Sequence, residues 1–131
     1  MGKLERWVAV DTSEEFLPEA LGARQARRFV RDELAAMGPV AELAELLVSE
    51  LVTNVVRHAR TPFTVAVTDG DPIRVSVRDG VAADLRVTAA RGDATSGRGL
   101  AILEALAHRW GVEPREGGKE VWFELLATQR L

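Results

Sequence analysis

The stretch Phe63-Thr-Val-Ala-Val-Thr-Asp-Gly-Asp-Pro-Ile-Arg-Val-Ser-Val-Arg78 contains two short segments in which apolar and polar residues alternate. The segments, 63–68 and 73–78, are separated by Asp69-Gly-Asp-Pro72. Alternation with a period of two is typical of strands that bury one face, and Gly, Asp and Pro favour turns. The stretch therefore predicts a β-hairpin, and the sheet that contains it is expected to be mainly antiparallel.

The residues before this hairpin are expected to form a strand and two helices. A short apolar run at 6–10 predicts the strand, which we expect to end at Asp11-Thr-Ser13. Apolar residues then recur at helical spacing from about residue 18 or 22 to residue 37, and Gly38-Pro39 stops that helix. A second helical pattern runs from about Val40 to His58.

The residues after the hairpin are expected to form a loop, a third helix and a second hairpin. Periodicity is lost over 79–96, which predicts a long loop of the kind that is usually functional. A helix is expected from the turn at Gly97-Arg-Gly99 to about residue 108. Two further apolar segments, 109–113 and 120–125, flank a Gly-containing turn and predict the second hairpin.

This order of elements predicts the fold class. Hairpins dominate the strands, and strict alternation of strand and helix is absent, which excludes a doubly wound parallel sheet. We expect an α/β two-layer sandwich (α+β), in which three helices cover one face of a mainly antiparallel mixed sheet. With 131 residues, the chain is expected to be a single domain, 1–131.

Composition excludes several classes of function. The chain has no Cys and only two His, which excludes disulfide scaffolds, Cys-ligated metals and Cys nucleophiles. Its net charge of −3 argues against direct nucleic-acid binding, which usually needs a basic surface. No apolar run is long enough to span a bilayer, and the first residues do not resemble a signal peptide. We therefore expect no membrane contact and a cytoplasmic location.

Polar residues occupy the inner stripe of the second helix. At about 100° per residue, Leu43, Leu47, Glu50 and Asn54 fall within about 60° of one another. A carboxylate and an amide on an otherwise apolar stripe indicate a wet pocket, because burying them without partners is costly. The alternative is a helix end that protrudes from the core. Oxygen ligands spaced in this way suit a hard cation, and Arg57 follows at a position from which it can reach an anion.

Asp79 is anomalous in the same way. Ile73, Val75 and Val77 share one face of the expected strand, and Asp79 continues their alternation. Its side chain is therefore expected on the core face, where an acceptor needs a donor such as the amine of a base. The alternative is a turn-forming Asp before Gly80.

Three other features carry weaker signals. Gly97-Arg98-Gly99-Leu100 opens a helix, where free N–H groups attract phosphate and Arg98 adds positive charge, although such a sequence is usually only a turn. The four Arg residues between Arg24 and Arg31 form a basic stripe, which usually is a solvated face. His58 is interpreted as a helix-end histidine rather than a ligand.

Together these motifs resemble a known family. Glu50-Leu-Val-Thr-Asn54-Val-Val-Arg57-His58-Ala59 resembles the N-box of the histidine-kinase-like (GHKL) ATPase superfamily. Asp79-Gly80 lies where the first glycine box of that superfamily is found, and Gly97-Arg-Gly-Leu100 resembles the second. The ending Gly117-Gly-Lys-Glu-Val-Trp-Phe-Glu124 is similar to that of the small actinobacterial anti-sigma regulatory factor serine kinases. The resemblance covers about Arg24 to Leu125.

The resemblance implies a Bergerat ATP-binding fold with ATP and Mg²⁺ as cofactors. Asn54 would hold Mg²⁺, Arg57 would contact phosphate, and Asp79 would accept a hydrogen bond from the adenine amine. The N–H groups of Gly97 to Leu100 would surround the phosphates. Glu50 would act as general base toward a serine hydroxyl of a protein substrate.

The resemblance also implies partners and leaves alternatives. We expect phosphorylation of an anti-sigma antagonist protein, sequestration of a sigma factor, or both, and we include a homodimer among the expected assemblies. The family pattern of Asp-x-Gly is replaced by Asp79-Gly80-Val81. A non-catalytic nucleotide-binding module that occludes its partner is therefore the alternative to a serine/threonine kinase. A DNA-binding regulator that uses the basic helix is disfavoured by the net charge.

Overall fold

The computed structural model describes residues 11–82 and 94–131, and for 94–99 it describes the backbone only. Five strands, three α-helices, one 3₁₀ turn and one π-helical turn form within these residues. In chain order they are β1 (Asp11–Phe16), α1 (Ala20–Glu33), η2 (Ala35–Met37), α2 (Val40–Asn54), η3 (Val55–Ala59), β2 (Phe63–Thr68), β3 (Ile73–Asp79), α4 (Ala94–Leu106), β4 (Arg109–Arg115) and β5 (Gly118–Leu125).

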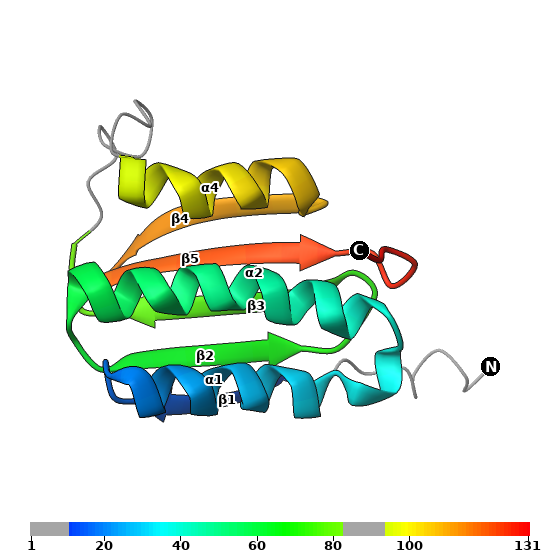
Figure 1. The fold of residues 1–131 in the computed structure, drawn as a ribbon, viewed down its shortest axis with the longest axis horizontal. Coiled ribbons are helices and arrows are strands. Elements are labelled where there is room, and N and C mark those ends of the chain that lie inside the picture. The colour runs from blue at the N-terminus through cyan, green and yellow to red at the C-terminus, as the bar shows by residue number, and fades with distance from the viewer. Residues whose placement is uncertain (1–10, 83–93) are drawn as a thin grey trace.

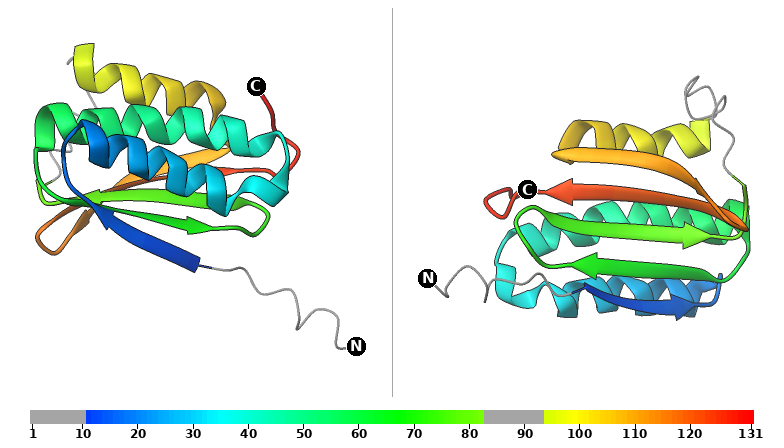
Figure 2. Two further views of the ribbon diagram at one scale, coloured as in Figure 1. Left: turned by 60° about the horizontal axis from the view of Figure 1, so that its bottom comes forward. Right: turned by 180° about the vertical axis from the view of Figure 1, so that it is seen from behind.

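The strands form one sheet in the order β1-β2-β3-β5-β4, and every described pair is antiparallel. The helices α1, α2 and α4 lie side by side over one face of this sheet (Figures 1 and 2). The expected two-layer α/β sandwich is confirmed. Within the described residues, no helix has the length and apolar character needed to cross a bilayer.

The hairpin predicted at 63–78 is confirmed, and its register explains the alternating pattern. Val65 lies opposite Val77, and Val67 lies opposite Val75. These four side chains are buried, because they point toward the helices, whereas Ala66 and Ser76 between them lie on the open face, where Ala66 is half-buried and Ser76 is buried. The period of two thus reports a sheet with one covered face.

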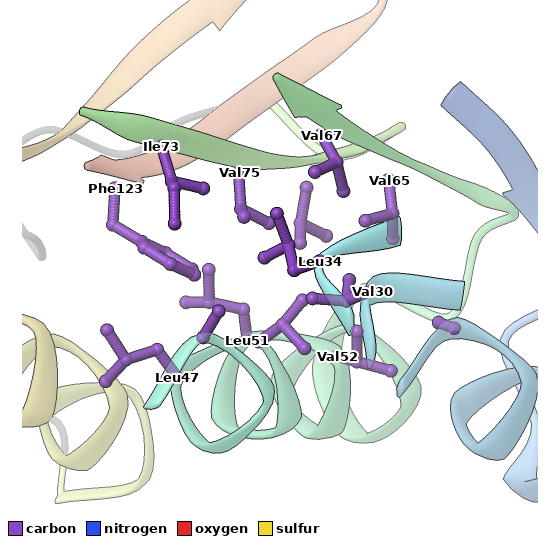
Figure 3. Packing of buried hydrophobic residues seen from close by; sticks show 14 of the residues in the cluster. Val30, Leu34, Leu47, Leu51, Val52, Val65, Val67, Ile73, Val75 and Phe123 are labelled. Carbon is purple, nitrogen blue, oxygen red and sulfur yellow. The ribbon is translucent and has the colours of Figure 1, made fainter. Parts of the chain in front are cut away.

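The core lies between the sheet and α2, the central helix. Side chains of β2, β3 and β5 project toward those of α1 and α2, and they meet in a continuous apolar layer (Figure 3). The residues that Figure 3 labels in this layer are Val30, Leu34, Leu47, Leu51, Val52, Val65, Val67, Ile73, Val75 and Phe123.

Three expected boundaries differ from the structure. The strand expected at 6–10 lies outside the described residues, and the sequence expected to end it begins β1 instead, because backbone pairing with β2 accommodates polar residues on an edge strand. The second helix is α-helical only to Asn54 and continues as the π-helical turn η3. The third helix begins at Ala94, before the Gly97-Arg-Gly99 turn where we expected it to start.

The open face of the sheet carries an ordered group of charges around Trp122. The Arg74 guanidinium lies 4.0 Å from the centroid of this ring and 3.1 Å from Glu124 Oε2. Trp122 Nε1 donates to Glu113, which also accepts a hydrogen bond from Arg115. That bond holds the pKa of Glu113 below its ordinary value and raises the pKa of Arg115. These side chains pair with one another on the face that no described helix covers, although Glu124 Oε1 accepts no hydrogen bond among the described residues.

Gly118 allows β3 and β5 to approach each other closely. A Cβ atom at this position would lie 1.8 Å from the carbonyl oxygen of Asp79. Gly117 differs, because its φ of +78° requires the left-handed region but no atom lies within 4 Å of its Cβ position. The first glycine is needed for space and the second for conformation, and together they set the start of β5 beside the end of β3.

We expect Gly118→Ala to destabilise the protein by about 1–3 kcal/mol or more, because the methyl group must force two paired strands apart. Gly117→Asn is the matched control and should be nearly neutral, because Asn tolerates the left-handed region. Urea denaturation of both variants measures the effect. A Gly118→Ala protein that unfolds at the same urea concentration as the parent would contradict the close approach.

Candidate functional site

A cavity of about 230 Å³ lies at one end of the sandwich, between the helices and the sheet. Its wall is mostly aliphatic, and a few polar side chains join it where α2 and β3 end. An apolar cavity with a small number of convergent polar groups is typical of a site for a small molecule. The residues that line it are Leu51, Asn54, Val55, His58, Ala59, Val77, Asp79, Val81, Ala82, Leu100, Val112, Lys119 and Val121.

Asp79 lies on the inner face at the end of β3, as its alternation predicts. Its side chain is only 5% exposed. Lys119 lies opposite it on β5, and the Lys119 ammonium donates to both carboxylate oxygens, at 3.0 Å to Oδ1 and 2.9 Å to Oδ2. The buried carboxylate therefore has a cationic partner within the chain, which stabilises its charge in a largely apolar wall.

Asp79 also forms the turn that follows β3. Its Oδ1 accepts a hydrogen bond from the backbone N–H of Val81, at 2.8 Å. The next residue, Gly80, donates its N–H to Thr61 Oγ1, also at 2.8 Å. The inner position of Asp79 that alternation predicts and its turn-forming role are both present, since the side chain is buried at the cavity and also accepts from the turn. Thr61 anchors this turn to the segment between η3 and β2.

The inner stripe of α2 divides into a buried part and a cavity part. Leu43 and Leu47 are fully buried, whereas Glu50 and Asn54 are half-buried. Asn54 is the last residue of α2 and lines the cavity, but Glu50, one helical turn earlier, lies outside the lining. The amide of Asn54 presents an oxygen where a ligand can enter, so its chemistry suits one ligand of a hard cation. Glu50 makes polar contacts of its own.

The π-helical turn η3 decides which residues follow Asn54 around the cavity. Val55, His58 and Ala59 line it, and Arg60 ends the turn with a φ of 55°. Single π-helical turns occur often at functional sites, because the extra residue redirects side chains. Arg57 is exposed on this turn and does not line the cavity.

The helix α4 contributes Leu100 to the wall. Gly97, Arg98 and Gly99 lie inside this helix, and Gly97 falls in its first turn. The first N–H groups of a helix have no partner within the helix, so this end of α4 can receive an anion. The side chain of Arg98 lies outside what the structure describes.

Apart from Leu100, the sequence interpretation missed the apolar residues of the cavity wall, and it also missed two polar ones, Lys119 and His58. Lys119 alternates in phase with Val121 and Phe123, whose side chains point inward, so the same argument that placed Asp79 on the inner face could have placed Lys119 there. His58 was interpreted as a helix-end residue, and the structure adds that it borders the cavity. No cluster of three or more His, Asp or Glu that could hold a metal occurs among residues 11–82 and 94–131. A cation here would therefore need oxygen atoms of a ligand in addition to the chain.

The layered α/β fold places an apolar cavity with a buried carboxylate between the helices and the sheet. Residues 16–125 match the family model described as the histidine kinase-like ATPase domain, and the chain belongs to this family. Among curated proteins there is no significant match.

One similar solved structure is "The crystal structure of the RsbU and RsbW domains of Rv1364c from Mycobacterium tuberculosis". The TM-score is 0.66 at 22% identity, over 89% of this chain and 32% of that chain. This chain thus spans about a third of that protein's length. The likeness supports the fold.

We expect the Asp79–Lys119 pair to be coupled in stability. Lys119→Met should cost about 1–3 kcal/mol, because it leaves a buried carboxylate with a single donor. Asp79→Asn combined with Lys119→Met should cost less than the sum of the two single changes, by about 0.5–3 kcal/mol. Chemical denaturation of the four proteins measures this coupling, and strictly additive costs would show that the pair does not interact in solution.

Proposed function

We propose that this protein is an ATP-binding regulator of the anti-sigma type, which transfers phosphate to a serine or threonine of an antagonist protein and sequesters a sigma factor. The observation that carries the proposal is a buried carboxylate, Asp79, in an apolar cavity whose wall also contains Asn54. Membership of the histidine kinase-like ATPase family supports a nucleotide as the ligand.

In this proposal the adenine base occupies the apolar part of the cavity. Aliphatic side chains of α2, β3 and β5, such as Leu51, Val77 and Val121, offer flat contact surface to the ring. Asp79 accepts a hydrogen bond from the exocyclic amine, which a neutral apolar wall cannot provide. Such a contact fixes the orientation of the base, and it points the phosphates along the cavity toward the helix ends.

The phosphates are assigned to the ends of α2 and α4. Asn54 would hold Mg²⁺ through one oxygen, and an ion bound by so few protein ligands would need oxygen atoms of the phosphates and water as well. Mg²⁺ would neutralise phosphate charge when bound. The N–H groups at the Gly97-Arg98-Gly99-Leu100 segment receive phosphate oxygens, which requires the first turns of α4 to open. Arg57 reaches the phosphates from the exposed side of η3.

Glu50 is assigned as the general base. Its carboxylate would take the proton of the substrate hydroxyl while the hydroxyl oxygen bonds to the γ-phosphorus. The bond between that phosphorus and the bridging oxygen then breaks, and ADP leaves with the electron pair. Phosphoryl transfer depends mainly on positioning and charge neutralisation, and a single oriented base is sufficient for the proton. Glu50 lies one turn before Asn54 on helix α2, so the helix fixes the position of the proposed base relative to the proposed metal ligand.

The protein partners in this proposal are those that the resemblance to the anti-sigma serine kinases implies, and the similarity to a structure that contains an RsbW domain supports this choice. The phosphate acceptor is an antagonist protein that presents a serine, and the sequestered partner is a sigma factor. The cytoplasm is the compartment that these partners share.

We expect the Mg²⁺ dependence of ATP binding to require Asn54. In Asn54→Ala, the gain in ATP affinity that Mg²⁺ confers should fall by about 10- to 100-fold, because the ion loses a protein ligand. Ser49→Ala on the same helix is the control and should keep the gain. Calorimetric titration with ATP, with and without Mg²⁺, provides the measurement. A parent protein that binds no ATP at all would refute the proposed function.

We expect Glu50→Gln to separate binding from catalysis. The amide keeps the shape of the side chain, so ATP affinity should stay near that of the parent. Phosphate transfer to an antagonist serine should fall by about 10²–10⁴-fold, because the base is lost. The assay follows labelled phosphate from ATP to candidate antagonist proteins, and thermal melting checks that the variant is folded.

Glu42→Gln is the matched control, since this exposed carboxylate lies on the same helix. Unchanged transfer in Glu50→Gln would remove Glu50 from the mechanism. Tight ATP binding by the parent without transfer to any antagonist would favour a non-catalytic regulator that acts by occlusion.

A further inference from the structure

Among the described residues, the Asp79–Lys119 pair leaves one acceptor and one donor unused. A carboxylate offers about four lone-pair sites, two on each oxygen, and an ammonium offers three N–H donors. Asp79 Oδ1 accepts from both Lys119 and the N–H of Val81, but Oδ2 accepts only from Lys119 among the described residues. Lys119 directs two donors to the carboxylate, and within the described part of the chain its third has no partner.

The unused acceptor and donor lie side by side at the cavity wall. Asp79 Oδ2 and Lys119 Nζ are 2.9 Å apart, and both residues line the cavity. A ligand edge that matches them must carry an N–H donor directly beside an acceptor. The Watson–Crick edge of adenine has this arrangement, since its exocyclic N6 amine donates and the adjacent ring nitrogen N1 accepts.

We propose that Lys119 is a second base-reading residue, whose ammonium donates to adenine N1 while Asp79 Oδ2 accepts from N6. The inference rests on the proposed function and deepens it, because it assigns the site two contacts to the base instead of one. The two side chains are already held beside each other in the site, because the register of β3 and β5 sets Lys119 opposite Asp79. The base therefore meets a fixed donor and a fixed acceptor, and binding costs little side-chain conformational entropy.

A purely structural Lys119 would behave differently. It would only neutralise Asp79, and the identity of the ring atom beside N6 would not affect affinity. Replacing N1 by a C–H group removes the acceptor and leaves the amine, so it tests the ammonium contact alone. The same replacement at N7 keeps the edge that faces the pair and serves as the control ligand.

The experiment titrates the full chain with ADP, 1-deazaadenosine diphosphate and 7-deazaadenosine diphosphate. The parent should bind the 1-deaza ligand about 10- to 100-fold more weakly than ADP, as expected for loss of a hydrogen bond to a charged group. The 7-deaza ligand should bind nearly as well as ADP. In Lys119→Met, the difference between ADP and the 1-deaza ligand should disappear.

Arg78→Met is the matched control variant. Arg78 precedes Asp79 on β3 and is exposed on the opposite face, so the variant loses the same charge without changing the cavity. It should keep the full preference for ADP over the 1-deaza ligand. A preference that persists in Lys119→Met would assign N1 to another group and overturn the inference.

The outcomes separate the two proposals. A parent that binds no ADP refutes the proposed function itself. A parent that binds ADP and the 1-deaza ligand equally well refutes the contact between Lys119 and N1 and leaves nucleotide binding intact. The ligand comparison on the parent decides this even if Lys119→Met fails to fold, and Lys119→Arg, which keeps a cationic donor, should retain part of the preference.

Discussion

The pairing of β3 with β5 is the constraint on which the candidate site depends. It sets Lys119 opposite Asp79, and it is possible only because Gly118 leaves room for the carbonyl of Asp79. The carboxylate of Asp79 is stable at this depth because its partner, Lys119, lies on a paired strand of the sheet rather than on a flexible loop. The cavity, its polar end and the turn after β3 all follow from this single backbone register.

The architecture could be predicted from periodicity because the face of the sheet that the helices cover is apolar and the open face is mostly polar. Both hairpins and the three helices form in the predicted order, although the second and third helices differ at one boundary each. The errors fall where tertiary context outweighs local preference. β1 is polar and could be recognised only from its pairing with β2, and the switch from α2 to η3 leaves the apolar spacing of the sequence unchanged.

The candidate site could be predicted in part for a related reason. The inner position of Asp79 follows from alternation within one strand, and the cavity position of Asn54 follows from one helical face. The Asp79–Lys119 contact joins residues 40 positions apart, so it depends on which strands pair, and no local pattern contains that information. The exposed position of Arg57 depends on the π-helical turn, and the local sequence pattern does not predict that turn either.

The strand order also has a consequence for the speed of folding. The β2–β3 and β4–β5 hairpins are local and can form early, but the sheet becomes continuous only when β5 docks on β3, which closes a loop of 40 residues between Asp79 and Lys119. Contacts of this sequence separation slow folding, because chain entropy is lost before the contacts form. The cavity lies at this non-local junction, so a ligand held by both strands would mainly slow unfolding if the junction forms after the folding transition state, and the lifetime of the folded state would then depend on occupancy.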